Sequence, residues 1–345
     1  FSVADTVSAK DGGGFGGNVS VTGNLTFTGD LIATTAGTSN FTAGVNAGNS
    51  IVSGGNYNVV IGDEAGTAIT TGDNNVAVGY NALATNSTAS TNIAVGYQAA
   101  YSNATGVGLT AFGANTLYAT TASDNCGIGT DNPGNYAAAL ESNTLGRFNT
   151  AVATGALGAD TKGSKSTAIG HSALATQNFT SATDSLNTAV GYQAGTAVTT
   201  GTLNTIIGSS AGDGITTGTR NTALGFNALG GAVDDGNYNT CIGSDAGLLT
   251  TGSQNCFVGG YDPSTGGCGE TMTTGSKNTI IGSFNGNQGG LDIRASSNHI
   301  VLSDGDGNPR LRINTAGYAL FSNIYNSSTR KTAASHVIHQ TTADT

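Results

Sequence analysis

Charged residues are scarce in this chain: among its 345 residues are 11 Lys and Arg and 21 Asp and Glu, together 9%. An ordinary globular domain has about a quarter. Pro (3 residues), Met (1) and Trp (none) are also rare, and no run of 18 apolar residues occurs. The shortage of charges and helix formers excludes a coiled coil. The shortage of Pro, without a Gly-X-Y period, excludes collagen. The lack of a long apolar run excludes a membrane-spanning helix.

The net charge of −10 restricts the partners of the protein. Phosphates need a basic surface, so nucleic acid is not an expected partner, and an anionic membrane surface is disfavoured for the same reason. The four cysteines (Cys126, Cys241, Cys256 and Cys268) lack the paired spacing of a zinc site. We also find no catalytic Ser/His/Asp grouping and no His cluster. We therefore expect no cofactor and no enzymatic activity.

What the chain does have is glycine, 55 residues of it, and much of this glycine recurs in a repeated phrase. The phrase is Asn-Thr-Ala-Val-Gly-x-x-Ala, clearest at 187–194. A period of 17 residues is too short for a helical pair or a propeller blade but suits one coil of a β-solenoid. The sequence therefore predicts an all-β protein, a parallel β-solenoid of about 13 coils. The 13 copies begin at Asn58, Asn75, Asn92, Leu109, Asn125, Asn149, Ser166, Asn187, Asn204, Asn221, Asn239, Asn255 and Asn278.

Each position of the phrase predicts a structural role. The fourth position is large and apolar in all 13 copies, which predicts a buried column, while the mostly Ala third position predicts a flat opposite face. The fifth position is Gly in 12 of 13 copies, which predicts a sharp corner. The opening Asn, present in 11 of 13, can form a hydrogen-bonded ladder from coil to coil. Thr-Thr-Gly, which precedes several copies, predicts a second strand and a second corner.

A coil of this size buries only two or three apolar side chains, at roughly 1.5–3 kcal/mol each. That gain barely offsets the entropy lost on ordering 17 residues. We therefore expect the chain to associate with copies of itself, as a parallel homotrimer with the small-residue face toward the three-fold axis.

The chain divides into three parts by composition. Residues 1–50 are rich in Gly and alternate polar with apolar residues, which indicates a stem or attachment region. Residues 51–297 are the repeat domain. In residues 298–345, two short strands around the turn 303–308 predict a hairpin that caps the last coil, followed by a polar tail.

Three coils carry extra residues, and insertions in a solenoid leave the stack as loops, often on a binding face. Their aromatic or charged residues, Tyr136, Arg147, Phe179 and Tyr261, are candidates for receptor contact; the alternative is that these insertions are merely tolerated. Tyr80, Tyr97, Tyr192 and Phe226 follow the corner Gly and either stack on sugar rings or simply cover the corner.

Two weaker patterns remain open. Asp304, Asp306 and Asn308 have a spacing that can place oxygens around Ca²⁺, but Pro309 stands where an EF-hand loop needs Gly, so a plain hairpin turn is the alternative. Cys256 and Cys268 could close the third insertion as a disulfide, or stay as thiols in a reducing cytosol.

The tandem phrase resembles the head repeats of trimeric autotransporter adhesins, and more closely the fibres of tailed phages of marine and cyanobacterial type. The segments 17–31 and 303–313 resemble the stem and the end of the shaft in such fibres, so the resemblance covers about 300 of 345 residues. It implies an intertwined, left-handed trimeric β-roll on the surface of a virion, a non-enzymatic tail fibre that mediates host attachment. Its expected partners are itself, other virion tail proteins and a host-surface receptor, such as a polysaccharide. The alternatives are a bacterial surface trimeric adhesin, a polysaccharide-degrading tailspike with paired carboxylates, and an ice-binding protein.

Overall fold

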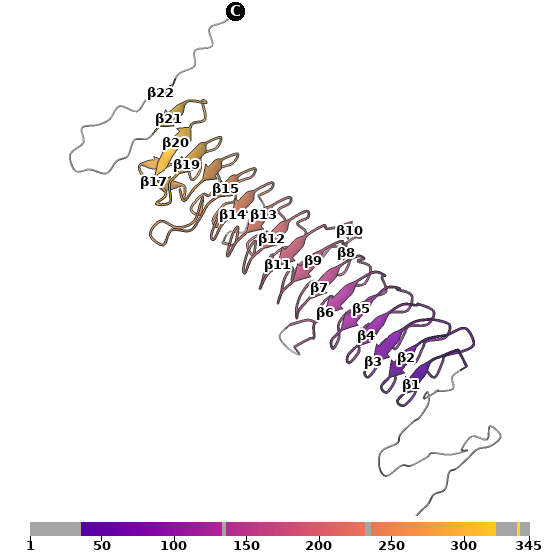
Figure 1. The fold of residues 1–345 in the computed structure, drawn as a ribbon. Coiled ribbons are helices and arrows are strands. Elements are labelled where there is room, and N and C mark those ends of the chain that lie inside the picture. The colour runs from indigo at the N-terminus through magenta and orange to yellow at the C-terminus, as the bar shows by residue number, and fades with distance from the viewer. Residues whose placement is uncertain (1–35, 133–135, 232–235, 322–336, 339–345) are drawn as a thin grey trace, which may run out of the picture.

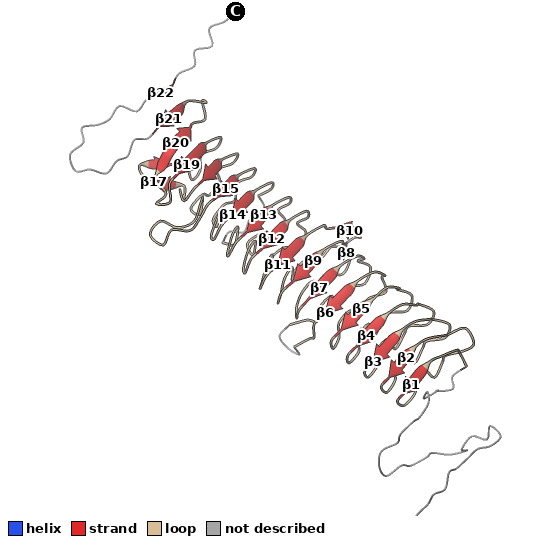
Figure 2. Ribbon diagram, in the orientation of Figure 1, coloured by secondary structure: helices blue, strands red, loops and turns tan. Residues whose placement is uncertain are grey.

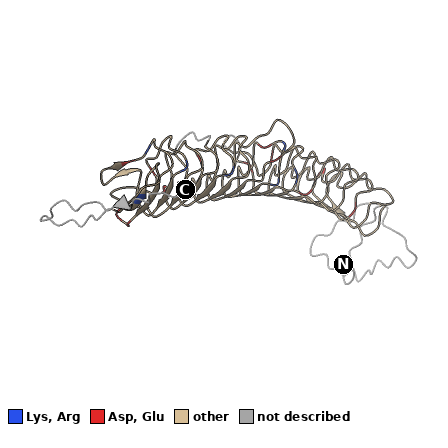
Figure 3. Cartoon of the chain, turned by 90° about the horizontal axis from the view of Figure 1, so that it is seen from above, with Lys and Arg blue, Asp and Glu red and all other residues tan. Residues whose placement is uncertain are grey.

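The computed structural model describes residues 36–132, 136–231, 236–321 and 337–338. In this part of the chain there are strands and turns but no helix, and the strands stack into one long, slightly bowed solenoid (Figures 1–3). Fifteen strands pair in parallel along it. The predicted all-β parallel β-solenoid is therefore confirmed, and the predicted stem residues 17–31 lie outside the described part.

Each stacked strand is three residues long, except the last, which has four. Equal positions of the repeated phrase pair with one another, for example Thr188 with Thr205 and Val190 with Ile207. The stacked strands are β1 (Phe41–Ala43), β2 (Val59–Ile61), β3 (Val76–Val78), β4 (Ile93–Val95), β5 (Thr110–Phe112), β6 (Cys126–Ile128), β7 (Thr150–Val152), β9 (Thr167–Ile169), β11 (Thr188–Val190), β12 (Thr205–Ile207), β13 (Thr222–Leu224), β14 (Thr240–Ile242), β15 (Cys256–Val258), β16 (Thr279–Ile281) and β19 (Ile300–Ser303).

The stack has one more coil at each end than the phrase revealed. β1 lies in the predicted stem region yet pairs in parallel with β2, and β19 lies in the predicted cap yet pairs in parallel with β16. The first extra coil keeps the opening Asn as Asn40, whereas the last one opens on His299. Fifteen coils at about 4.8 Å each give a body on the order of 70 Å long.

A coil contains one strand rather than the two we predicted. The Thr-Thr segments are bends or irregular chain, and most of the rest of each coil is a series of tight turns. The turns use positive φ angles at non-glycine residues, such as Asn81 (57°) and Leu83 (49°). Away from the main sheet, a further parallel pair joins β8 (Gly163–Ser164) to β10 (Thr183–Asp184), where an insertion lengthens the coil. A 17-residue coil therefore turns too tightly to hold a second three-residue strand.

The prediction of which face is buried was wrong. The third position points inward: Ala77, Ala168 and Ala189 have no exposed surface. The large fourth position points outward, and the exposed fraction reaches 55% at Phe112 and 42% at Leu224. The small-residue face consequently lies inside the coil and cannot face a three-fold axis. The physical reason is the thinness of the coil, in which the strand lies so close to the opposite wall that mostly Ala fits between them.

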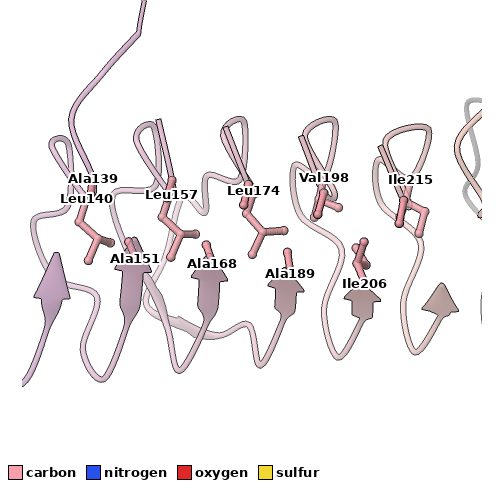
Figure 4. Packing of buried hydrophobic residues seen from close by; sticks show 14 of the residues in the cluster. Ala139, Leu140, Ala151, Leu157, Ala168, Leu174, Ala189, Val198, Ile206 and Ile215 are labelled. Carbon is pink, nitrogen blue, oxygen red and sulfur yellow. The ribbon is translucent and has the colours of Figure 1, made fainter. Parts of the chain in front are cut away.

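The interior is a single column of apolar side chains along the axis. In Figure 4 the inward alanines Ala151 and Ala168 point toward Leu157 and Leu174 of the opposite wall. In the coil of Ala189, the side chain that fills this space is Val198, which comes from a different turn of the coil. Many coils thus combine one or two Ala with one larger aliphatic residue, whereas others bury two large residues, such as Ile206 with Ile215 or Ile280 with Phe284.

The Asn ladder that we predicted is confirmed, and its geometry explains two columns at once. The Oδ1 of Asn204 accepts a hydrogen bond from the backbone N–H of Asn221 at 2.9 Å. Its Nδ2 donates across the coil to the carbonyl of Gly218 at 2.9 Å. The same two bonds recur in most coils, so the side chain ties each strand to the next coil and to the opposite corner. The ladder is interrupted at Leu109 and Ser166, which lack the amide.

The corner glycine is required by both its backbone angle and its neighbour. Gly79 has a φ of 125°, a conformation that side chains disfavour. A Cβ placed there would lie 2.5 Å from the carbonyl oxygen of Gly96 in the next coil. The predicted sharp corner is therefore confirmed.

Antiparallel strands close the C-terminal end of the solenoid. β19 pairs with β20 (Pro309–Ile313), β20 with β21 (Ala319–Phe321), and β21 with β22 (Val337–Ile338). A small hairpin, β17 (Asn287–Gln288) with β18 (Leu291–Asp292), lies in the preceding coil. The predicted hairpin around 303–308 is thus present, and it covers the edge that the last coil would expose.

Candidate functional site

The first candidate surface is the outward side of the stacked strands, which we call the strand face. It consists of the second and fourth positions of the phrase. The fourth positions form an aliphatic ladder in which every member from Ile61 to Leu302 is half-buried or exposed. The second positions are Thr in eight coils. Among the described residues, neither the second nor the fourth positions include a charged side chain. Single exposed apolar side chains are normal on a protein surface. A continuous strip of them, in contrast, indicates a contact surface.

Two of the three insertions leave the stack at the same corner, where the strand arrows end in Figure 1. The first begins after Gly129, and the isolated bridge Asn132–Tyr136 closes it. The third begins after Gly259, and the bridge Asp262–Gly266 closes it in the same way. Tyr136 and Tyr261 are 44% and 51% exposed, respectively, so both candidate residues present their rings to solvent.

The other two receptor-contact candidates are placed less favourably for contact. Phe179, in the second insertion, is only 6% exposed and packs inside. Arg147 is exposed, but its guanidinium donates to the carboxylate of Asp124 at 2.8 Å and lies 5.0 Å from the ring centre of Phe148. The four candidates therefore do not form one cluster, and a receptor role for them stays a prediction.

The aromatic residues after the corner glycines are exposed rather than folded against the coil. The rings of Tyr80 and Tyr97 stack with their centres 5.7 Å apart, and both are about half exposed. His171 stacks on Tyr192 at 5.5 Å and meets Tyr136 edge to face at 4.4 Å. The second group therefore joins a predicted insertion residue to the corner column, a connection that sequence spacing did not show.

A groove of about 280 Å³ opens beside this second aromatic group. Tyr136 lines it together with the small residues Gly155 and Gly158 and the hydroxyl residues Ser142 and Ser172. Sequence reasoning missed this groove, although the runs of Gly and Ala at 153–159 and 173–175 were the available signal.

The residues proposed for Ca²⁺ are engaged within the protein. The Asp304 carboxylate accepts hydrogen bonds from the backbone N–H of Asn308 at 2.8 Å and from the guanidinium of Arg310. Burial by itself would raise the pKa of Asp304, but the hydrogen bonds from Asn308 and Arg310 together outweigh it and hold the pKa below its ordinary value. Asp306 is exposed on the turn. The loop thus has the contacts of a hairpin turn, and within the described residues no group of three or more His, Cys, Asp or Glu could hold a metal ion.

All four cysteines are free thiols. Cys126 and Cys256 occupy the second position, on the strand face, and Cys241 occupies the buried third position. Cys268 is buried, and this burial raises the pKa of its thiol to about 12. Cys256 and Cys268 do not form the disulfide that was one of the two alternatives.

A buried polar cluster fills the gap that Ser166 leaves in the Asn ladder. The Nε2 of Gln177 donates to the carboxylate of Asp160 at 2.6 Å, and its Oε1 accepts from Asn187 at 2.8 Å. The hydroxyls of Ser166 and Ser185 lie 2.7 Å apart beside them. Burial raises the pKa of Asp160 in spite of these hydrogen bonds. The cluster is closed to solvent, which indicates a structural role.

In the described part of the chain there is also no helix suited to crossing a membrane. Comparisons with protein-family models, with curated proteins and with solved structures gave no match for this chain.

Proposed function

We propose that this protein is a non-enzymatic structural fibre, an intertwined homotrimer with left-handed coils, that a tailed phage carries on its virion and uses for attachment to the host cell. The observation that carries the proposal is the aliphatic ladder, which runs along the whole solenoid and is left open to solvent in a single chain.

A second copy of the same chain is the partner that fits this ladder. A partner must offer an apolar strip of the same length and the same repeat of about 4.8 Å. Another copy in parallel register does so at every coil. The strand face has no charged side chain that would repel the same face of another copy. Association of identical chains around a common axis would therefore cover it. The resemblance of the repeated phrase to adhesin heads and phage fibres favours three copies.

Attachment to a host is supported by the contrast between the regular coils and the few coils that carry insertions. Most coils repeat with little change, as a shaft requires, whereas insertions with exposed tyrosines project at two heights on the same side. Loops on a rigid scaffold are the usual place for recognition residues.

The oligomeric state is tested by measuring the mass of the protein in solution with light scattering. We expect three chains per particle. The double variant Ile207→Glu and Leu224→Glu places charge in the middle of the ladder and should yield single chains or aggregates. The double variant Thr180→Glu and Ser181→Glu adds the same two charges on exposed insertion residues and should leave the trimer intact. A stable wild-type monomer would contradict the proposal.

Separate measurements test whether the fibre belongs to a phage or to a bacterium, and whether it attaches to the host, degrades polysaccharide or binds ice. Gold-labelled antibodies against the chain should decorate the tail fibres of phage particles; decoration of a bacterial surface would instead support the adhesin alternative. Release of reducing sugar from host polysaccharide would support the tailspike alternative. Thermal hysteresis would support ice binding, for which the outward Thr column is the relevant surface.

A further inference from the structure

The groove beside the first insertion is a local departure from the repeat. In the seventh position of the phrase eight of the 13 copies carry Asn, Asp, Gln or Glu, such as Gln98 or Gln193, whereas this coil has Gly155. In the tenth position this coil and the next have Gly158 and Ala175, whereas Tyr101 and Tyr118 of two earlier coils fill the same column and stack on each other at 5.2 Å. Gly155 and Gly158 thus leave two nearby positions of one coil without a side chain, and the hollow is the result.

An aromatic wall stands at one side of this hollow. Tyr136 comes from the insertion, while His171 and Tyr192 come from the corner column of two successive coils. The three rings form a continuous series, and the two outer ones, Tyr136 and Tyr192, are 44% and 52% exposed. Exposed rings held in place by ring-to-ring contacts offer flat apolar surfaces with little entropy left to lose.

The polar groups of the groove are hydroxyls rather than charges. None of the residues that line it is charged. The hydroxyl of Ser172 lies 3.1 Å from Nδ1 of His171. Among the described residues, the hydroxyl of Ser142 makes no hydrogen bond within the protein and is available to a ligand. A ligand that suits this lining has an apolar face, hydroxyl edges and no net charge.

We propose that this groove binds a neutral sugar unit of a host-surface polysaccharide, with its C–H face against Tyr136 and its hydroxyls on Ser142 and Ser172. A sugar ring has both of the required surfaces. The volume of about 280 Å³ lies at the small end of ligand sites, which suits one or two sugar units. None of the residues that line the groove belongs to the strand face. The trimer proposed above, which is formed through the strand face, therefore leaves the groove open. The inference deepens the attachment function proposed above and rests on it.

The test uses the full chain and saturation-transfer NMR with the methyl glycosides of glucose, galactose, mannose and N-acetylglucosamine as probes. We expect at least one glycoside to receive saturation from the wild-type protein. Tyr136→Ala should raise its dissociation constant about tenfold, because a ring contact contributes about that factor. Ala175→Tyr fills the hollow with the side chain that Tyr101 carries in the same column, and should abolish binding with little risk to the fold.

The matched control is Tyr80→Ala, which removes an equally exposed stacked tyrosine that does not line this groove, and it should bind as the wild type does. If no glycoside receives saturation, or if Tyr80→Ala loses as much affinity as Tyr136→Ala, the sugar site is refuted. Adsorption of the labelled protein to cells that the phage infects separates this failure from that of the attachment function. Wild-type adsorption that Ala175→Tyr leaves unchanged retains attachment but refutes this groove as its site.

Discussion

Replacing Asn204 with Ala should destabilise the solenoid more than any exposed substitution of the same kind. The variant leaves the backbone N–H of Asn221 and the carbonyl of Gly218 without the partners that now lie 2.9 Å away. Asn204 is 1% exposed, so water does not replace them. A buried backbone group left without a partner costs about 1–3 kcal/mol, so we expect the free energy of unfolding to fall by about 2–6 kcal/mol.

Urea unfolding followed by circular dichroism measures this change, and Asn49→Ala is the control. The Asn49 side chain also accepts a hydrogen bond from a hydroxyl, that of Thr67 at 3.0 Å, but it is exposed, so its loss should cost about 0.5 kcal/mol. Hydrogen exchange adds a local readout: the amide of Asn221 should exchange faster in the variant, while that of Asn239, bonded to the intact Asn221 side chain, stays protected. Equal effects of the two substitutions would refute the reasoning.

Two further predictions concern the corner and the buried acid. Gly79→Ala should lower the free energy of unfolding by about 1–3 kcal/mol, because it combines a positive φ with a close carbonyl, whereas Gly260→Ala, where a Cβ meets nothing within 4 Å, should have little effect in the same urea assay. Because the folded state binds the proton of Asp160 more tightly than the unfolded chain does, its contribution to stability is full below the ordinary Asp pKa of about 3.9 and is lost as the pH rises through the raised pKa. The difference in unfolding free energy between Asp160→Asn and the wild type should therefore change with pH over that window, and a difference that is constant with pH would contradict it.

The repeat made the architecture predictable, since period and column identity determine a parallel stack with glycine corners and an Asn ladder. The face assignment failed because large apolar residues at Ile207 and Leu224 were taken to be buried by their own coil. Size alone does not tell whether a side chain is buried by its own chain or left for another. The alanine at many third positions was the overlooked sign, because a thin interior favours small side chains there, although it also buries third-position residues as large as Ile206 and Phe257.

The candidate sites were predictable only in part. Insertion lengths identified the loops of Tyr136 and Tyr261, and both rings are exposed. Phe179 looks equivalent in sequence but is buried, because the longer coil folds its insertion back on the stack. The meeting of Tyr136 with His171 was not predictable, since it depends on how far the insertion reaches along the axis, which spacing does not encode.

The Asn ladder has a consequence for how such a protein changes in length. Every rung bonds only within its own coil and to the coils directly before and after it, and equal positions pair across each junction. A unit of 17 residues can therefore be duplicated or deleted between any two regular coils without altering a single bonding pattern elsewhere. Each event moves the parts beyond it along the axis by about 4.8 Å. The length of the solenoid is thus set by the number of repeats in its gene, in steps of one coil.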